Sequence, residues 1–242
     1  MARLFNGTSD DIQMGTTVAK PNTFTVTFWI KATGATVGFP VNYREGGIHR
    51  GWNALITAGN KLRFSTDANA VIDTFSTSTV VDNGWWFAAM VYNGATQGLY
   101  MSSATNRVIN LEDSDTQTGN IDYGAANFRI GEASEGASNY TGSVAEVGYW
   151  NRPLSFFEIT VAKRNVGMIS RGLIGYWPLW GSGGTEKDLS TSNNIGIVNA
   201  PTRAAHPPLG RYTIHNRYDI TQVITPVLIG GKFFESGPKR MY

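Results

Sequence analysis

Short runs in which apolar and polar residues alternate are the feature of this sequence that most constrains its fold. The run TFTVTFWIKA, residues 23–32, places Phe24 and Ile30, with the two apolar residues between them, on one face. Such a period of two predicts a half-buried β-strand. Residues 53–67 and 84–103 each read as two strands joined by a turn, AGNK in the first and Asn-Gly in the second. The chain is therefore predicted to be built from antiparallel hairpins.

The composition suits a single all-β domain. Of the 242 residues, 41% are hydrophobic, 16% are charged and 28 are glycines, which favours one sizeable core and short strands joined by tight turns. One short helix is expected at residues 154–165, where Ser155 as N-cap and Glu158 three residues later form a capping box. We predict an all-β, antiparallel two-sheet jelly-roll sandwich with one short helix and an extended C-terminal arm.

Several kinds of site and location are disfavoured by what the sequence lacks. It has no cysteine, which excludes disulfides and thiolate metal sites. The N-terminal residues show no signal-peptide core and no apolar run is long enough to span a membrane, so we expect a soluble protein made in a cytoplasm. His49, His206 and His215 lie far apart, without the spacing of a metal site. No nucleophile elbow or phosphate-binding loop is present.

An acidic residue, Glu146, interrupts the apolar run SVAEVGYW, and its role bears directly on function. Strict alternation would place one set of residues on one face of a strand and the remaining set on the other. The first set is Val144, Glu146, Gly148 and Trp150, and the second is Ala145, Val147 and Tyr149. The chain then turns sharply at Asn-Arg-Pro before the helix.

Four motifs in order resemble those of laminin-G-like, concanavalin A-type jelly rolls. They are RLFNGTSDDIQMG near the start, FTVTFWIKA, GWWFAAMVYNGATQGLYM, and FRIGEASEGASNYTGSVAEVGYWNRPLSFFEI. The resemblance covers roughly residues 1–165 and implies the same two-sheet fold. Residues 172–200 look like the segment that usually precedes the first motif. We interpret them as a permuted strand of a domain spanning residues 1–200, the alternative being a truncated second repeat.

The family includes glucanases, so glycosidase activity is one hypothesis for this chain. Laminarinase-type members carry acidic residues as E-x-D-x-E on one strand, where two carboxylates share acid and nucleophile work. Here Val144 and Gly148 flank Glu146 instead, and we predict no enzyme. We expect Glu146 to be a structural acid that bonds nearby backbone or Arg152.

Acidic and aromatic residues are the candidates for a metal site and a sugar site. No cofactor is predicted. Many relatives bind calcium, however, and Asp10, Asp11, Glu132 and Glu135 are the candidate ligands for such a site here. For a carbohydrate site, Trp52 and Tyr140 are the candidates, because both were expected in loops where an aromatic ring could stack on a sugar.

Residues 201–242 differ in character from the rest. They hold six basic and two acidic residues together with many aromatic and β-branched ones, which is typical of an assembly arm rather than of a nucleic-acid site. The partner-binding candidates in this arm are Arg211, Tyr212, Arg217, Tyr218, Phe233, Phe234 and Arg240.

The resemblance extends to laminin-G-like proteins of tailed bacteriophages and implies a non-enzymatic virion protein, most of all a capsid decoration or cement subunit. Its expected partners are the major capsid protein and neighbouring copies, with a homotrimer favoured, surface glycans allowed, and no nucleic acid or membrane. Its expected location is the virion. The alternative is a carbohydrate-binding, lectin-like module of a phage tail or surface protein.

Overall fold

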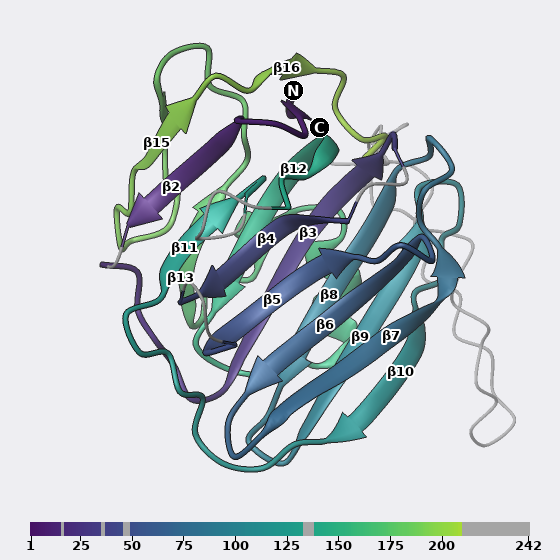
Figure 1. Cartoon of the computed structure of the whole chain (residues 1–242), viewed down its shortest axis with the longest axis vertical. Coiled ribbons are helices and arrows are strands. Elements are labelled where there is room, and N and C mark those ends of the chain that lie inside the picture. Colours follow the sequence, from purple (N-terminus) through teal and green to yellow (C-terminus); the bar gives the residue numbers. More distant parts are fainter. Residues whose placement is uncertain (16, 35–36, 46–48, 133–137, 210–242) are drawn as a thin grey trace, which may run out of the picture. The chain divides into compact units, whose positions relative to one another are not determined.

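The computed structural model describes residues 1–15, 17–34, 37–45, 49–132 and 138–209. The chain divides into two units, residues 1–209 and 210–242, and the second lies wholly outside the described residues. The first unit is a sandwich of two antiparallel sheets, as predicted. Figure 1 shows the layers, with β2, β4, β5, β6 and β7 in front of β3, β8, β9 and β12.

The first sheet, which we call sheet A, has eight strands. In spatial order they are β10 (Asn110–Thr116), β9 (Thr96–Ser103), β8 (Trp86–Tyr92), β3 (Phe24–Ala32), β12 (Thr141–Trp150), β1 (Ala2–Asn6) and β16 (Thr202–Ala204), with β13 (Leu173–Trp177) also pairing with β12.

The second sheet, sheet B, also has eight strands. In spatial order they are β14 (Thr185–Glu186), β15 (Gly196–Asn199), β2 (Asp11–Gly15), β11 (Asn127–Ile130), β4 (Gly38–Arg44), β5 (Gly51–Ile56), β6 (Lys61–Asp67) and β7 (Val71–Thr79).

The main hydrophobic core lies between the two sheets and follows the predicted alternation. The four apolar residues of β3 that share a face, Phe24, Val26, Phe28 and Ile30, all belong to it, whereas Trp29 faces the other way. The two predicted hairpins form as β5–β6 and β8–β9. Their turns use a left-handed residue, Asn60 in the first and Gly94 in the second, as tight hairpin turns require.

A second hydrophobic cluster covers the outer face of sheet A. It joins Trp29 and Trp150 to the helix α1 (Phe156–Ala162) and to the short 3₁₀ helix η1 (Val166–Met168). The predicted capping box is confirmed, because Ser155 accepts from the Glu158 amide while the Glu158 side chain accepts from the Ser155 amide. None of the helices described is long and apolar enough to cross a membrane.

The late segment of the chain is part of the same sandwich. Residues 173–177 form β13 in sheet A, while β14 and β15 extend sheet B beside β2. The side chain of Trp177 is fully buried in the main core. β16 pairs with β1, so residues 202–204, which we assigned to the arm, belong to sheet A.

Candidate functional site

Glu146 sits on a β-bulge in the middle of β12. Ala145 pairs with Trp29 and Gly148 with Thr27, so β12 carries one extra residue against its partner. Glu146 has a φ of +54°, a left-handed conformation that is rare and strained for a glutamate. A bulge changes the side of the sheet to which the following side chains point, and this bulge does so for the second half of β12.

The bulge overturns the predicted faces of this strand. Val144, Val147 and Tyr149 all belong to the main core, whereas Ala145 and Trp150 belong to the outer cluster. Strict alternation had placed Val144 on the side of Trp150. The extra residue shifts the register by one, and side chains before and after the bulge therefore exchange sides.

The Glu146 carboxylate is buried and holds three side chains from the late segment. The Tyr176 hydroxyl donates to Oε2 at 2.6 Å, and the Trp180 indole N–H donates to Oε1 at 2.9 Å. The Nε2 atom of His206 lies 2.8 Å from the same Oε1. The Glu146 side chain thus contacts neither of the partners that we had assigned to it, the nearby backbone and Arg152. Burial and the Glu146 carboxylate raise the pKa of Tyr176 far above its usual range.

The two nitrogens of the His206 ring both face oxygen acceptors. While Nε2 faces Glu146, Nδ1 lies 2.9 Å from the backbone oxygen of Pro207. A neutral imidazole carries one N–H and donates to only one of these oxygens, whereas the doubly protonated ring donates to both. In the neutral ring, the tautomer decides which of these two contacts is a hydrogen bond.

Arg152 pairs with the helix cap instead of with Glu146. Its guanidinium donates to both carboxylate oxygens of Glu158, at 2.6 and 3.1 Å. The hydrogen bond from Arg152, together with the Ser155 amide, lowers the pKa of Glu158 to about 2. Arg152 thus fastens the sharp turn to the start of α1.

The two predicted sugar-stacking residues are buried. Trp52 lies within β5 and is 0% exposed, and Tyr140 is 1% exposed. Trp52 stacks on Phe24 in the core at 5.4 Å between ring centroids. The expectation that both residues are accessible was wrong. Trp52 is a core residue of β5, and Tyr140, directly before β12, packs on Phe5 in the main core. The seven arm candidates, Arg211, Tyr212, Arg217, Tyr218, Phe233, Phe234 and Arg240, lie outside the described residues.

A row of polar side chains crosses the outer face of sheet B. The strand register places Arg129, Asn42, Asn53, Ser65 and Asp73 side by side on five neighbouring strands. The three central residues are almost completely buried. Asn42 keeps an oxygen without a hydrogen-bond partner among the described residues, but this atom lies too deep for direct contact with a ligand.

The charges at either end of this row are paired. Arg129 lies 3.0 Å from Glu132, and Arg63 lies 3.3 Å from Asp73. Arg63 Nε, Asp73 Oδ1 and Arg129 Nε have no hydrogen-bond partner among the described residues, but all three atoms are buried. Because its polar atoms are buried, the outer face of sheet B is the less open of the two polar regions.

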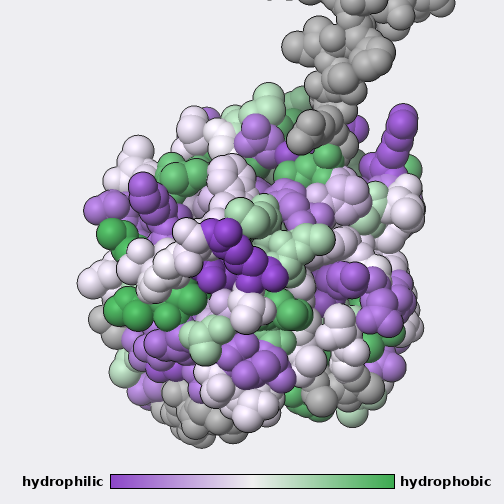
Figure 2. All heavy atoms as spheres, turned by 90° about the horizontal axis from the view of Figure 1, so that it is seen from above, coloured by the Kyte–Doolittle hydropathy of each residue, from purple (hydrophilic) through white to green (hydrophobic). Residues whose placement is uncertain are grey.

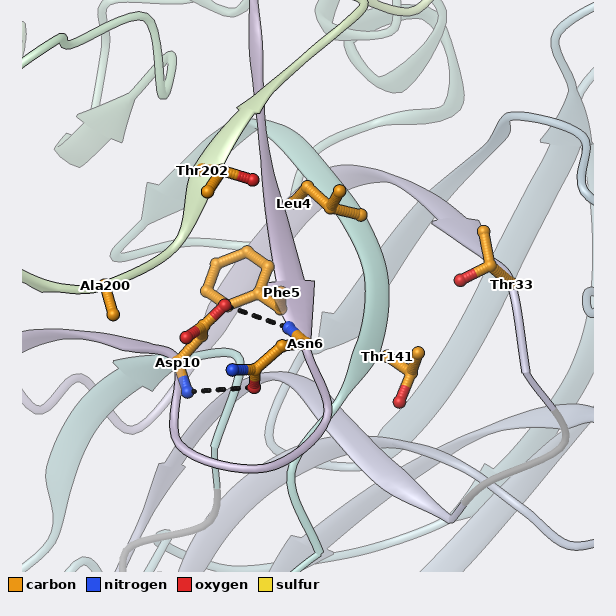
Figure 3. A pocket seen from close by; sticks show the side chains of 8 residues that line it. All are labelled: Leu4, Phe5, Asn6, Asp10, Thr33, Thr141, Ala200 and Thr202. Carbon is orange, nitrogen blue, oxygen red and sulfur yellow. Dashed lines mark hydrogen bonds between the residues drawn. The ribbon is translucent and has the colours of Figure 1, made fainter.

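The more open region is a hollow beside β1, which lies between β12 and the edge strand β16 (Figure 3). Strand pairing builds it, because Leu4 lies opposite Thr202 on β16 and Asn6 lies opposite Thr141 on β12. The lining consists of Leu4, Phe5, Asn6, Asp10, Thr33, Thr141, Ala200 and Thr202. Over the end of the sandwich seen from above, hydrophilic and hydrophobic residues are interspersed (Figure 2).

The acidic group of this hollow is held in a fixed orientation. Asp10 Oδ2 accepts from the Asn6 backbone amide at 3.0 Å, and the Asn6 side chain in turn accepts from the amides of Thr8 and Ser9. The other carboxylate oxygen, Oδ1, has no partner among the described residues. Figure 3 shows the carboxylate and the amide of Asn6 side by side at the foot of β1.

The lining suits a small polyhydroxylated ligand. Asp10 offers an acceptor although it is only 5% exposed, and the exposed hydroxyls of Thr33 and Thr202 offer donors and acceptors. Leu4, which is 38% exposed, offers an apolar surface, whereas Phe5 belongs to the main core. Asp10 is the one acid among the lining residues.

Of the described residues left open for calcium, Asp11 and Glu132 lie together, whereas Asp10 lines the hollow. Asp10 lines the hollow, whereas Asp11 lies 3.6 Å from Arg129 on sheet B, as part of the same charge group as Glu132. Burial and the Asp11 carboxylate raise the pKa of Glu132. Glu135 is outside the described residues, and within the described part no three metal-binding side chains cluster.

Comparison with known proteins agrees with the sandwich. Residues 6–160 match the model of the concanavalin A-like lectin/glucanase superfamily. The chain belongs to this superfamily. No curated protein matches it.

Solved structures with the same fold include several sugar-binding proteins. One is a putative carbohydrate binding protein from Bacteroides ovatus, with a TM-score of 0.57, 20% identity, and coverage of 83% of this chain and 58% of that one. Another is domain 4 of AbnA, an extracellular arabinanase from Geobacillus stearothermophilus, in complex with arabinotriose, with a TM-score of 0.51, 18% identity, and coverage of 66% and 75%. A third is the carbohydrate-binding module CBM40 of the Ruminococcus gnavus IT-sialidase bound to α2,3 sialyllactose, with a TM-score of 0.51, 12% identity, and coverage of 66% and 96%. At these identities the likeness shows the fold.

Sequence reasoning missed the groups that line the hollow and those that surround Glu146. Thr202 and His206 lie in the segment assigned to the arm, and Trp180, which is 48% exposed, was not among the predicted site residues. The only local signal was the turn sequence NGTSDD at residues 6–11, in which Asn6 and Asp10 are typical turn-capping residues.

Proposed function

We propose that this chain is a non-catalytic carbohydrate-binding module that takes one sugar unit in the hollow beside β1. The observation that carries the proposal is the oriented Asp10 carboxylate, 5% exposed, which lines the hollow together with the exposed side chains of Leu4, Thr33 and Thr202. Hydrogen bonding to hydroxyls by a few fixed polar groups is how concave sites achieve specificity. Sugar-binding proteins among the structures with this fold support the proposal.

A glycan array probed with the full chain, followed by calorimetry on the best binders, tests this function. We expect Asp10→Asn to weaken binding about tenfold, because a carboxylate oxygen is replaced by an amide nitrogen, which cannot accept a hydrogen bond. Thr202→Val, which removes an exposed hydroxyl at constant shape, should also weaken binding. The matched control is Asp113→Asn, an exposed acid on β10 at the opposite edge of sheet A. Equal affinities for the three variants would refute the site.

A second candidate function is assembly on a virion, as a capsid decoration subunit. The observation that favours it is the composition of residues 210–242, with five basic and two acidic residues among many apolar ones. Such a segment suits burial against an acidic partner or a neighbouring copy. Light scattering of the full chain and of its Phe233→Ser/Phe234→Ser variant tests this idea. An oligomer that becomes a monomer in the variant would support it, and two monomers would count against it.

A further inference from the structure

Trp180 is an exposed indole whose ring is anchored. It is 48% exposed, whereas Trp29, Trp52, Trp150 and Trp177 are buried. Its N–H donates to the buried Glu146 carboxylate at 2.9 Å. The loop beside it is open, since a Cβ added at Gly183 or at Gly184 would meet no atom within 4 Å. One part of the ring is thus fixed by the protein while solvent can reach the rest.

Backbone strain concentrates at the residues that place this ring. Seven described residues other than glycine have a left-handed φ, and four of them are Asn or Ser. The three others are Glu146, Leu179 and Ala200. Glu146 holds the Trp180 N–H, Leu179 directly precedes Trp180, and Ala200 lines the hollow. Bulky residues in this conformation are unfavourable and tend to persist at functional sites.

The hollow and Trp180 lie along the same edge of the sandwich. Thr202 lines the hollow, and four residues later His206 contacts the same Glu146 oxygen as Trp180 does. The side chain of Arg203, next to Thr202, also donates to the backbone oxygen of Gly181, the residue after Trp180. Trp180 does not line the hollow, so a sugar ring held there leaves the indole to a further unit of an oligosaccharide.

We propose that Trp180 is a second subsite, a stacking platform for a further sugar unit of the same glycan chain whose first unit occupies the hollow. This inference rests on the proposed carbohydrate-binding function. The C–H face of a pyranose or furanose ring packs on an aromatic ring. Because Glu146 already fixes the indole, little side-chain freedom is lost when the sugar binds. Glu146 is a positioning residue in this scheme, since it acts through Trp180.

A purely structural reading makes a different prediction. In that reading, Glu146 only ties Tyr176, Trp180 and His206 to β12, and the exposed part of the indole has no ligand. Replacement of Trp180 would then change stability without changing how affinity depends on glycan length. The dependence on length therefore separates the two readings.

The test is a length series measured on the full chain. The probes are arabinose with arabinotriose, glucose with cellotriose, and N-acetylglucosamine with its trimer, by calorimetry for the trimers and NMR titration for the monosaccharides. We expect Trp180→Ala to weaken trisaccharide binding roughly three- to tenfold and to leave monosaccharide binding within about twofold. Trp180→Phe keeps a ring but lacks the anchoring N–H. Its trisaccharide affinity should lie between that of the parent and that of Trp180→Ala. Phe157→Ala, which removes another exposed aromatic on α1, is the control and should change neither.

The outcomes distinguish this inference from the proposed function. If Asp10→Asn weakens every length while Trp180→Ala weakens none, the hollow stands and the second subsite is wrong. The second subsite is also wrong if Trp180→Ala weakens monosaccharide and trisaccharide binding equally. If no saccharide of any length binds, both the proposed function and this inference fall.

Discussion

At the scale of single residues, the molecule depends on a carboxylate in an unfavourable backbone conformation. Glu146 is 3% exposed, has a φ of +54°, and accepts hydrogen bonds from side chains of the late segment. These hydrogen bonds offset the cost of the left-handed backbone, because without the carboxylate the buried Tyr176 hydroxyl would have no acceptor. The two contributions can be separated by substitution at this one position.

We predict that Glu146→Ala lowers the free energy of unfolding by about 2–4 kcal/mol, because the Tyr176 hydroxyl loses its acceptor while the strain remains. Glu146→Gly loses the same bonds but relieves the left-handed backbone, so it should be more stable than the alanine variant by about 1 kcal/mol. Urea unfolding followed by tryptophan fluorescence measures both. A glycine variant no more stable than the alanine variant would show that the bulge is unstrained.

At the scale of elements, the helix α1 is defined by its N-terminal cap. Ser155 and Glu158 bond each other's backbone amides, and Arg152 clamps the Glu158 carboxylate from the preceding turn. The exposed face of α1 carries Phe156 and Phe157, while Ile159 and Ala162 pack on sheet A. The position of the helix thus depends on its cap and on two small contacts with the sheet.

This cap should show a characteristic pH dependence. The pKa of Glu158 is lowered to about 2 in the folded state, so its charge stabilises the fold above the ordinary glutamate range near pH 4.5. That contribution is lost as the pH falls from about 4.5 towards 2. Glu158→Gln keeps the capping hydrogen bond but not the charge. We expect it to be less stable than the parent by about 0.5–1 kcal/mol at pH 7 and equally stable at pH 2. Unfolding curves at both pH values measure this difference, and a gap that persists at pH 2 would contradict the ion-pair origin.

At the scale of the whole molecule, the two ends of the described chain complete both sheets. β13 and β16 join sheet A beside strands from the middle and the start of the sequence, and β15 joins sheet B beside β2. A buried ion pair, Arg3 with Glu186 at 2.6 Å, ties β1 to β14. Residues 1–209 should therefore unfold as one unit.

Trp177→Ala tests this cooperativity. Removal of a fully buried indole from the main core should lower the free energy of unfolding by about 3–5 kcal/mol and shift a single transition as a whole. Phe157→Ala, at an exposed position, should change it by less than about 0.5 kcal/mol. Thermal unfolding followed by far-ultraviolet circular dichroism and by fluorescence measures both variants. If the late segment melted before the rest, residues 173–204 would be an appendage of the sandwich.

The sequence by itself determined the layered all-β architecture, the two hairpins β5–β6 and β8–β9, and the capped helix, because these depend on local periodicity and on residues a few positions apart. Only the tertiary structure decided which groups surround Glu146 and where an open polar hollow lies. A one-residue bulge reversed the faces of β12, and the contacts of Glu146 join residues 30 to 60 positions apart in sequence. Local patterns hold no record of such register shifts or long-range contacts, which are set by how the two sheets pack as a whole.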